Sequence, residues 1–387
     1  MPVTEPAWIN GEYAILRESV QKFIASEVAP FYDGWEAQGI VPRETWHKLG
    51  EQGFLAPDIP EEYGGAGGRY EHLAVIIAEF ARHGYATIAS SMVSVHSGIV
   101  SHYIFNNGSE AQKRRYLPAM ASGHMVAALA MTEPAAGSDL QGIKTTAKRD
   151  GNGYVLNGSK TFISNGQHCD LVVVVAKTDT NVAGAKGTSL LFVERDTDGF
   201  SRGRNLDKIG LRSSDTSELF FDNVRVDGDA VLGPEHGGFA VMMNELPRER
   251  LTLAIGGLAA AEGALQWTID YVQERQAFGQ AVAKFQNTRF KIAEMMTEIR
   301  TLRAFVDECI LLLSKGELDT ATASMAKLKA TEMQGEVIDG CLQLFGGYGY
   351  MREFPISRAF VDARVQRIYG GTSEVMKEII ARDILGR

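Results

Sequence analysis

Cysteine is scarce in this chain, and several features that would mark a specialised class of protein are missing. Only three cysteines, Cys169, Cys309 and Cys341, occur among the 387 residues. They are too widely spaced for a metal site, and so few cysteines are typical of a reducing compartment. The net charge is −9 and there is no Lys/Arg run, which argues against nucleic acid or an anionic membrane surface as the main partner. No apolar run reaches the roughly 18 residues of a transmembrane helix.

The first 20 residues, MPVTEPAWINGEYAILRESV, lack two common targeting patterns. They contain neither the basic-then-apolar order of a signal peptide nor an Arg-rich transit pattern. We therefore expect a cytoplasmic protein without a membrane span. Because 45% of the residues are hydrophobic and 22% are charged, a chain of this length can form a large core and about two or three domains.

The apolar pattern divides the chain into three parts. In the N-terminal part, Ile15, Val20, Phe23 and Ile24 recur at helical spacing, and Pro30 ends the stripe. In the middle part, KTTAKRDGNGYVLNGSKTFIS alternates around an Asp-Gly-Asn-Gly turn and predicts a hairpin. LVVVVAKT, TSLLFVER and SELFFDNVRV resemble further strands. The C-terminal part contains RFKIAEMMTEIRTLRAFVDECILLLS and TATASMAKLKATEMQGEVIDGCLQLF, two long amphipathic segments that indicate a helical bundle.

These patterns predict an α+β fold with three domains. We expect an N-terminal all-α domain at residues 1–125, a middle β-barrel or sandwich domain at 126–238 and a C-terminal helical bundle at 239–387.

Four glycine-containing motifs could carry chemistry. LAMTEPAAGSD (129–139) offers hydroxyls and open backbone N–H groups, although such a stretch is usually a connecting loop. ERQAFGQAVAKFQNTR (274–289) places an Arg beside a small-residue turn, where it could bind pyrophosphate or simply be solvated. CLQLFGGYGYMREFP (341–355) has more glycine than a helix cap requires. RVQRIYGGTSEVMKEII (364–380) puts two glycines before a helix start, which indicates that something large approaches the backbone there.

Together and in this order, the four motifs resemble the acyl-CoA dehydrogenase family across essentially the whole chain. The resemblance implies the same α–β–α order, with a four-helix bundle as the C-terminal domain. It also implies bound FAD, an acyl-CoA substrate that is oxidised to the trans-2-enoyl-CoA in fatty acid β-oxidation, and a homotetramer in which subunits share the FAD sites. The usual electron acceptor of such enzymes is an electron-transferring flavoprotein.

The resemblance also assigns roles to individual positions. Residues expected at the flavin, or at the part of FAD held with a neighbouring subunit, are Leu129, Met131, Thr132, Gly137, Ser138, Phe162, Ser164, Arg275, Phe278, Gln286, Gln343, Gly346, Gly347, Thr372 and Glu374. Residues expected near the acyl-CoA are Ser138, Lys186, Pro247, Arg248, Arg250, Gly370 and Gly371.

The base that removes the α-proton departs from the commonest family pattern. Many relatives carry it directly after the Tyr of the C-terminal motif, where this chain has Gly370, and glycine cannot abstract a proton. Long-chain and isovaleryl-CoA relatives carry a Glu immediately before an Arg on an earlier helix, and Glu249 with Arg250 matches that pattern. We predict that Glu249 is the base, that its carboxylate occupies space that a side chain at 370 would fill, and that the N–H of Gly370 binds the thioester oxygen.

Two features near Glu249 leave alternatives open. Pro247 predicts either a kink or a late helix start, which could aim Glu249 into the pocket. Glu245, one helical turn away, is the rival carboxylate. An apolar pocket that excludes water should raise the pKa of the base towards neutrality.

The acyl chain and the reaction class are less sharply defined by the sequence. LAIGGLAAAEGALQ could serve close helix packing or a deep channel for a long or branched tail, and ASSMVSVHSGIV could form the floor of that channel. An acyl-CoA oxidase or a flavin monooxygenase would share the fold, although the pairing of Glu249 with Gly370 argues against a monooxygenase. A non-catalytic assembly protein would bind FAD poorly.

Overall fold

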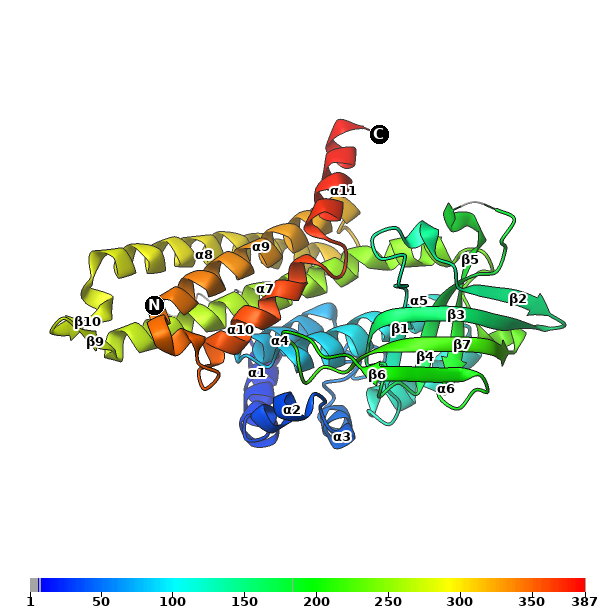
Figure 1. Ribbon diagram of the computed structural model, residues 1–387, viewed down its shortest axis with the longest axis horizontal. Coiled ribbons are helices and arrows are strands. Elements are labelled where there is room, and N and C mark those ends of the chain that lie inside the picture. Colours follow the sequence, from blue (N-terminus) through cyan, green and yellow to red (C-terminus); the bar gives the residue numbers. More distant parts are fainter. Residues whose placement is uncertain (1–5, 7, 183, 387) are drawn as a thin grey trace.

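The computed structural model describes residue 6, residues 8–182 and residues 184–386. Helices from the two ends of the sequence pack together, and the sheet lies at one end of the elongated molecule (Figure 1). The predicted order of a helical N-terminal part, a β-sheet middle part and a helical C-terminal part is confirmed. Among the described residues, no helix is long and apolar enough to cross a membrane.

The N-terminal part consists of short helices with local start signals. Before the last of them, Ser109 and Gln112 form a capping box, in which each side chain accepts a hydrogen bond from the other residue's backbone N–H at 3.3 and 2.8 Å. The elements are α1 (Glu12–Phe23), η1 (Ile24–Val28), α2 (Tyr32–Gln38), α3 (Arg43–Glu51), η2 (Glu61–Tyr63), α4 (Tyr70–Arg82), the π-helical segment η3 (Ile88–Val100), α5 (Ser101–Asn107) and α6 (Glu110–Ala121).

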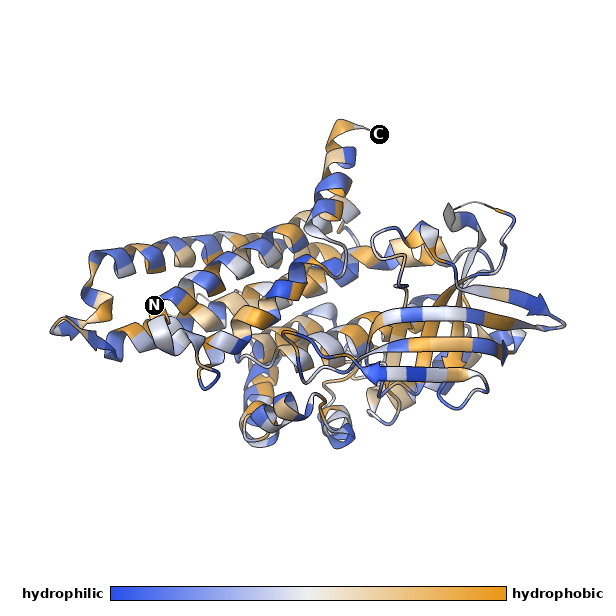
Figure 2. Ribbon diagram, in the orientation of Figure 1, coloured by the Kyte–Doolittle hydropathy of each residue, from blue (hydrophilic) through white to orange (hydrophobic). Residues whose placement is uncertain are grey.

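The middle part is an eight-stranded sheet. The strand order is β6-β7-β3-β2-β4-β5-β8, and β1 pairs in parallel with β4. The predicted hairpin is confirmed, because Asp150 and Gly153 close an antiparallel β2–β3 ladder. The strands β1, β4 and β5 are the most apolar part of the sheet (Figure 2). The strands are β1 (Ala127–Ala130), β2 (Thr146–Asp150), β3 (Gly153–Ser164), β4 (Leu171–Lys177), β5 (Thr188–Glu194), β6 (Phe200–Asn205), β7 (Thr216–Val226) and β8 (Val231–Leu232).

The C-terminal part is built on three long helices that lie alongside one another (Figure 1). The two long segments predicted from the sequence are confirmed as α8 and α9. A small hairpin joins α7 to α8, and α11 projects from the body of the molecule. The elements are α7 (Gly238–Glu274), β9 (Gln276–Ala277), β10 (Gln280–Ala281), α8 (Gln286–Ser314), α9 (Thr320–Phe345), η8 (Gly346–Tyr350), α10 (Pro355–Ala363), η9 (Arg364–Arg367) and α11 (Ser373–Leu385).

The two helical parts share one hydrophobic core. Buried residues of α1, α4 and η3 pack against those of α7, α8 and α9 in a single cluster. The small residues of α7 permit this close approach, since a Cβ at Gly263 would lie 1.9 Å from the carbonyl oxygen of Arg82 on α4. The packing interpretation of the small-residue stretch is therefore confirmed for this glycine.

Candidate active site

Glu249, the expected base, lies on α7. This helix begins nine residues before Pro247 and continues through it, so the alternative of a late helix start at the proline is wrong. Pro247 still removes one backbone N–H and leaves the carbonyl of Met243 without its usual helical partner. The helix is continuous because its flanks pack against α4 and α9. Glu249 is thus presented by a long, packed helix.

The short helix α5 supplies partners for two acidic side chains of α7. The Tyr103 hydroxyl donates to Oε1 of Glu249 at 2.8 Å. The amide groups of Asn106 and Asn107 donate to Glu245 at 3.0 to 3.2 Å and reach both of its oxygens. In the part of the chain that the structure describes, Tyr103 is the one hydrogen-bond donor to the Glu249 carboxylate. Glu249 therefore keeps an oxygen available for a proton, whereas the oxygens of Glu245 are both engaged.

The environment of Glu249 favours its neutral form. Only 8% of the residue is exposed, and Oε1 accepts just one hydrogen bond. Burial raises the pKa of Glu249 to about 7, and the nearby charge of Glu245 contributes to the increase. The hydrogen bond from Tyr103 and the charge of Arg250 act in the opposite direction and limit the rise. A carboxyl group with a pKa near neutrality is suited to accept a proton during catalysis.

Arg248 connects this segment of α7 to the N-terminal part. Its guanidinium forms an ion pair with Asp58, donates to the carbonyl of Gly98 at 3.0 Å and lies 4.7 Å from the ring centre of Tyr70. Burial by itself raises the pKa of Asp58, but the charges of Arg248 and His102 outweigh it and hold this pKa well below its usual range. Arg248, which the resemblance places near the acyl-CoA, therefore has its guanidinium bound by groups of the protein itself.

Two buried cations, on α7 and α9, interact electrostatically, and the one on α9 contacts the Gly370–Gly371 turn. Arg250 is buried and donates to the Ser324 hydroxyl at 3.1 Å. Lys327 is fully buried, and its ammonium group donates to the carbonyl of Gly371 at 2.7 Å. Burial, together with the charge of Arg250, lowers the pKa of Lys327 to about 8. The turn that carries the expected thioester-oxygen donor is therefore anchored from α9.

Both glycines of this turn are required by the backbone and by the available space. Gly370 has φ +62° and Gly371 has φ +90°, in the left-handed region that favours glycine. A Cβ at Gly370 would lie 2.2 Å from Cδ1 of Leu253, which is one helical turn beyond Glu249 on α7. The face of α7 that carries Glu249 therefore approaches residue 370. However, Leu253, and not the Glu249 carboxylate as predicted, lies within 4 Å of a Cβ at this position.

A second group of expected site residues gathers at the edge of the sheet. Thr132 lies in the loop of residues 131–139 that follows β1, called the Thr132 loop below. Its carbonyl accepts a hydrogen bond from the N–H of Thr161 at 2.9 Å. Next to Thr161, Phe162 has φ +58° at an irregularity of the β3–β7 ladder and is 69% exposed. Such a bulge redirects one side chain away from the sheet. The structure thus brings the Thr132 loop close to Phe162 and Ser164.

The Thr132 loop is fixed by a buried ion pair. Lys160 is fully buried and donates to the carbonyl of Met131 and to Glu133, each at 2.9 Å. Glu133 also accepts the N–H groups of Lys144 and Thr145 at 2.6 and 2.9 Å. Burial lowers the pKa of Lys160 to about 8 against the raising effect of Glu133. This network holds the loop in shape while leaving its outer side, including Gly137 and Ser138, exposed.

A third group lies at the far end of the C-terminal helices. Arg275, Gln343, Gly346 and Gly347 line one hollow, in which the guanidinium of Arg275 lies 5.3 Å from the ring centre of Tyr348. Gly346 ends α9 with φ 61°, as the helix-cap interpretation predicts. The adjacent β9–β10 hairpin exposes 97% of Phe278, and Gln286 begins α8 nearby.

The remaining expected residues lie on loops and at a helix start. Thr372 caps α11 by accepting the N–H of Val375 at 3.2 Å, and Glu374 stands in the first turn of that helix. Lys186 is exposed on the segment η5 (Gly184–Gly187), which contacts η4 (Leu140–Gly142) just after Ser138.

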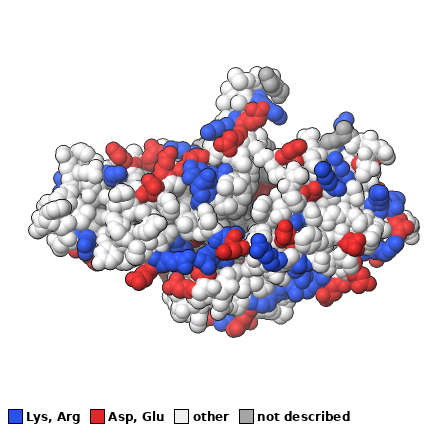
Figure 3. All heavy atoms as spheres, in the orientation of Figure 1, with Lys and Arg blue, Asp and Glu red and all other residues white. Residues whose placement is uncertain are grey.

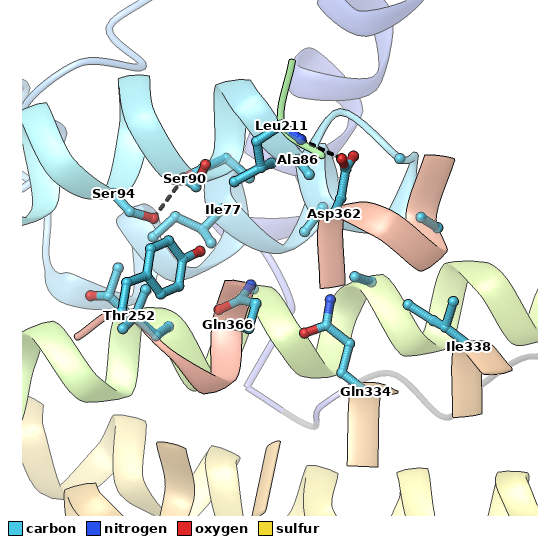
Figure 4. Close-up of a pocket in the computed structure, with 18 of the residues that line it drawn as sticks. Ile77, Ala86, Ser90, Ser94, Leu211, Thr252, Gln334, Ile338, Asp362 and Gln366 are labelled. Atoms are coloured by element: carbon cyan, nitrogen blue, oxygen red, sulfur yellow. Dashed lines mark hydrogen bonds between the residues drawn. The ribbon is translucent and has the colours of Figure 1, made fainter. Parts of the chain in front are cut away.

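A pocket extends along α7 from Thr252, which lies three residues after Glu249 (Figure 4). Its walls come from α4, η3, α7, α9 and α10, and Tyr369, which precedes Gly370, also lines it. Most of the wall is apolar or small, including Ile77, Ala81, Ala89, Leu253, Gly256 and Ala260. The sequence analysis proposed the small-residue stretch as a possible channel wall and the 89–100 segment as a possible channel floor. Residues of both segments line this pocket. A mainly apolar lining with a few polar side chains is typical of sites that bind small organic ligands.

The two groups of expected FAD residues have the chemistry and the space that such a cofactor requires. A Cβ at Gly137, Gly346 or Gly347 would meet nothing within 4 Å, so the backbone there is open to a ligand. Arg275 offers a planar cationic fork for pyrophosphate oxygens. Thr132 and Ser164 offer hydroxyl groups next to the exposed ring of Phe162. These residues fit FAD, with the two groups lying at opposite ends of α7.

Several residues of the site were missed by the sequence analysis. Tyr103, Asn106 and Asn107 lie on one face of α5 at spacings of three and four residues, a pattern that is visible in SHYIFNN. Lys327 carries no such signal, because only the fold shows that it is buried under the turn at Gly371.

Comparisons with known proteins cover nearly the whole chain. Three protein-family models match the chain: the N-terminal, middle and C-terminal domains of acyl-CoA dehydrogenase, at residues 10–124, 128–224 and 236–385. The long-chain specific acyl-CoA dehydrogenase of Sus scrofa is 49% identical over 97% of this chain and 87% of its own length.

Solved structures agree with this comparison. The crystal structure of an acyl-CoA dehydrogenase from Geobacillus kaustophilus has 45% identity and a TM-score of 0.94 over 98% of this chain and 100% of its own. A glutaryl-CoA dehydrogenase from Mycobacterium smegmatis, solved in complex with FADH2, has 29% identity and a TM-score of 0.91 over 98% of this chain and 95% of its own.

Proposed function

Because the chain belongs to the acyl-CoA dehydrogenase family, we propose that it oxidises long saturated acyl-CoA thioesters to trans-2-enoyl-CoA with Glu249 as the base. The observation that carries this proposal is the environment of Glu249. Its buried carboxyl group has a pKa raised by burial to about 7 and one restraining hydrogen bond from Tyr103, and it lies one helical turn before Leu253, which lines a mainly apolar pocket.

Glu249 takes the α-proton, and the surrounding residues prepare it for this task. Tyr103 fixes the position of Oε1, while Glu245 is occupied by Asn106 and Asn107. The apolar surroundings keep water away from the carboxylate and strengthen it as a base.

The Gly370 N–H binds the thioester oxygen in this proposal. The positive φ of Gly370 and the anchor from Lys327 to the carbonyl of Gly371 hold this N–H in one orientation. A fixed donor at the oxygen stabilises the charge that develops as the α-proton leaves. The cationic side chains of Lys327 and Arg250 act on the same charge at longer range.

FAD, when bound, accepts the hydride that leaves the β-carbon. The Thr132 loop, Phe162 and Ser164 would hold its ring system, and Thr372 and Glu374, at the start of α11, would lie near the flavin as the family resemblance implies. The hollow around Arg275, Gln343, Gly346 and Gly347 holds the pyrophosphate and adenine of an FAD in a neighbouring subunit. This arrangement is supported by the distance between the two groups of residues, which lie at opposite ends of α7.

Oligomerisation follows from this shared site, and the family resemblance implies a homotetramer. The end of the C-terminal helices that carries the β9–β10 hairpin and η8 is called the bundle end below. It exposes several large apolar side chains, among them Phe278 at 97% and Tyr350 at 83%. Figure 3 shows few charged side chains on the visible face of this end. The chain has 17094 Å² of accessible surface, whereas a compact monomer of 42.2 kDa would have about 15,000 Å². The exposed apolar side chains and the excess surface favour burial against other copies of the chain.

The preferred substrate has a long acyl chain. The fourteen positions from Leu253 to Trp267, both in the pocket wall, correspond to about 21 Å of helix. An extended chain advances about 1.2 Å per bond, so this length holds roughly 18 bonds. Electrons then pass to an electron-transferring flavoprotein, the acceptor expected from the family resemblance.

The test is anaerobic mixing of the yellow protein with saturated acyl-CoAs from about C4 to C18, including branched chains, while flavin absorbance is followed. We expect rapid bleaching that is most efficient for the longest chains. Efficient bleaching only by short chains would contradict the long-chain assignment. Failure of every acyl-CoA to bleach the flavin would contradict the dehydrogenase function, and rapid reoxidation by oxygen after bleaching would indicate an oxidase.

A further inference from the structure

The acyl pocket is not uniformly apolar. Four of the polar side chains that line it between the region of Glu249 and Trp267 are those of Ser90, Gln334, Asp362 and Gln366. They come from η3, α9, α10 and η9, so residues far apart in the sequence meet around one part of the pocket (Figure 4). An unsubstituted hydrocarbon chain offers no hydrogen bond to any of them.

Gln334 is the most deeply placed of the four. Only 3% of the residue is exposed, and its Oε1 is buried without a hydrogen-bond partner among the described residues. The side chain reaches the pocket by passing over Gly257 of α7, because a Cβ at that position would lie 3.2 Å from Oε1. The glycine at 257 thus makes room for the amide group, which Figure 4 shows projecting from α9 towards the pocket.

The other three side chains surround the same space. Ser90 Oγ and Gln366 Oε1 are also buried atoms without a partner in the described part of the chain. Asp362 accepts the N–H of Leu211 at 2.5 Å through one oxygen. Burial raises the pKa of Asp362 to about 7, so its carboxyl group is partly neutral near this pH and can also donate a hydrogen bond.

Three buried polar atoms without partners around one pocket need an explanation. An unpaired buried polar group costs free energy, and native proteins contain few of them. Other buried atoms of this kind lie elsewhere in the described part of the chain, but these three belong to residues that line the same pocket. This shared location indicates that the bound molecule itself supplies the hydrogen bonds.

We propose, resting on the dehydrogenase function above, that this pocket selects acyl chains that carry a hydroxyl group within the hydrocarbon tail. A hydroxyl group both donates and accepts, so it can donate to Gln334 or Gln366 and accept from an amide N–H or from Ser90. The apolar walls on either side hold the hydrocarbon that precedes and follows the hydroxyl group. The reaction at the α- and β-carbons is unchanged, and the hydroxyl group takes no part in it.

The position of the polar group along the chain follows from the register of α7. Leu253 marks the level of Gly370 and the thioester, and Gly257, over which Gln334 passes, is four residues further. Four residues of helix correspond to about 6 Å, or roughly five bonds of an extended chain. The hydroxyl group is therefore expected at about carbon 6 to carbon 9, well away from the reacting carbons.

The test compares kcat/KM for octadecanoyl-CoA with kcat/KM for octadecanoyl-CoAs that carry a single hydroxyl group at successive positions along the chain. For the wild type, we expect the hydroxylated chains near carbon 6 to carbon 9 to be preferred over the unsubstituted chain. In Gln334→Met, the ratio of hydroxylated to unsubstituted kcat/KM should fall about tenfold, the usual effect of one lost hydrogen bond. Gln366→Met provides a second, independent variant.

The matched control is Ile338→Leu, which alters the shape of the same pocket without altering its polarity and should keep the wild-type ratio. A wild type that prefers the unsubstituted chain over every hydroxylated one would overturn the proposal while leaving the dehydrogenase function intact. A ratio that Gln334→Met and Gln366→Met leave unaltered would also overturn it. If neither kind of chain bleaches the flavin, the dehydrogenase function itself fails.

Discussion

At the scale of single residues, the account depends on how one carboxyl group is kept both buried and reactive. Glu249 loses hydration on α7 and receives only one hydrogen bond, so its pKa rises to about 7. Glu245, four residues earlier, is equally buried but has amide donors on both oxygens. The difference between two neighbouring carboxylates is therefore one of hydrogen bonding, and it assigns their roles.

Changing Tyr103 to Phe tests the restraint on the base. The hydrogen bond from Tyr103 lowers the pKa of Glu249, so its removal should raise that pKa further. Because the base must be deprotonated to act, flavin reduction increases as pH rises through this pKa. The rate profile of the variant should move to higher pH by about one unit, the equivalent of one hydrogen bond.

The measurement is the rate of flavin reduction by an acyl-CoA as a function of pH. Tyr116→Phe is the control, since Tyr116 donates to the distant Glu194, and it should keep the wild-type profile. An unaltered profile in Tyr103→Phe would show that this hydrogen bond does not tune the base.

Lys327 gives a second prediction at this scale. Its pKa is lowered by burial to about 8, so the ammonium charge beside Gly371 is lost as pH rises above that value. Flavin reduction in the wild type should therefore decline at alkaline pH. In Lys327→Met, the rate should fall by about tenfold or more, and the alkaline decline should disappear.

The control is Lys329→Met on the same helix, where the lysine is exposed and pairs with Glu298. It should behave as the wild type. A Lys327→Met protein with wild-type rates and the same alkaline decline would show that the charge of Lys327 does not promote flavin reduction.

At the scale of elements, α7 organises the molecule because it contacts both helical parts and the sheet. Glu262 of α7 is almost fully buried between Arg82 of α4 and Arg303 of α8. Burial by itself raises the pKa of Glu262, but the charges of Arg303 and Arg82 outweigh it and hold this pKa below its ordinary value. The pair contributes stability at neutral pH that is lost as pH falls through the lowered pKa.

Glu262→Gln should destabilise the protein by about 3–5 kcal/mol, because the buried guanidinium of Arg303 and the partly buried guanidinium of Arg82 lose the carboxylate that they share. We expect the temperature of unfolding to fall by several degrees, as measured by circular dichroism. Glu298→Gln, which breaks an exposed pair with Lys329, should change stability by less than about 1 kcal/mol. Similar small effects for both variants would contradict the role of this network in joining the helices.

Much of the element-level architecture could be predicted from the sequence, and the misses have physical causes. The β2–β3 hairpin and the two long helices follow from local turn chemistry and apolar periodicity. The late helix start at Pro247 failed because tertiary packing of α7 outweighs the local cost of the proline. Tyr103 and Lys327 could not be assigned, since their roles depend on contacts between segments 146 and 44 residues apart in the sequence.

At the scale of the whole molecule, the two groups of expected FAD residues lie towards opposite ends of α7, whose 37 residues span about 55 Å. The account therefore predicts that sedimentation gives a species of four times the 42.2 kDa chain. Phe278→Asp places a charge on the most exposed apolar side chain of the bundle end and should weaken assembly and FAD retention together.

Ile15→Asp is the control, because Ile15 is 70% exposed on α1, away from the bundle end. It should leave both properties unaltered. A wild type that sediments as a monomer with full FAD content would contradict a site shared between subunits.

The most direct test of the central claim is the rate of flavin reduction under anaerobic conditions in Glu249→Gln and Glu245→Gln, each mixed with a long-chain acyl-CoA. The account predicts a loss of about 10²–10⁴-fold in Glu249→Gln, the range for removal of a general base. Glu245→Gln should remain within about tenfold of the wild type, because this side chain is occupied by Asn106 and Asn107. An active Glu249→Gln protein beside an inactive Glu245→Gln protein would contradict the assignment of the base.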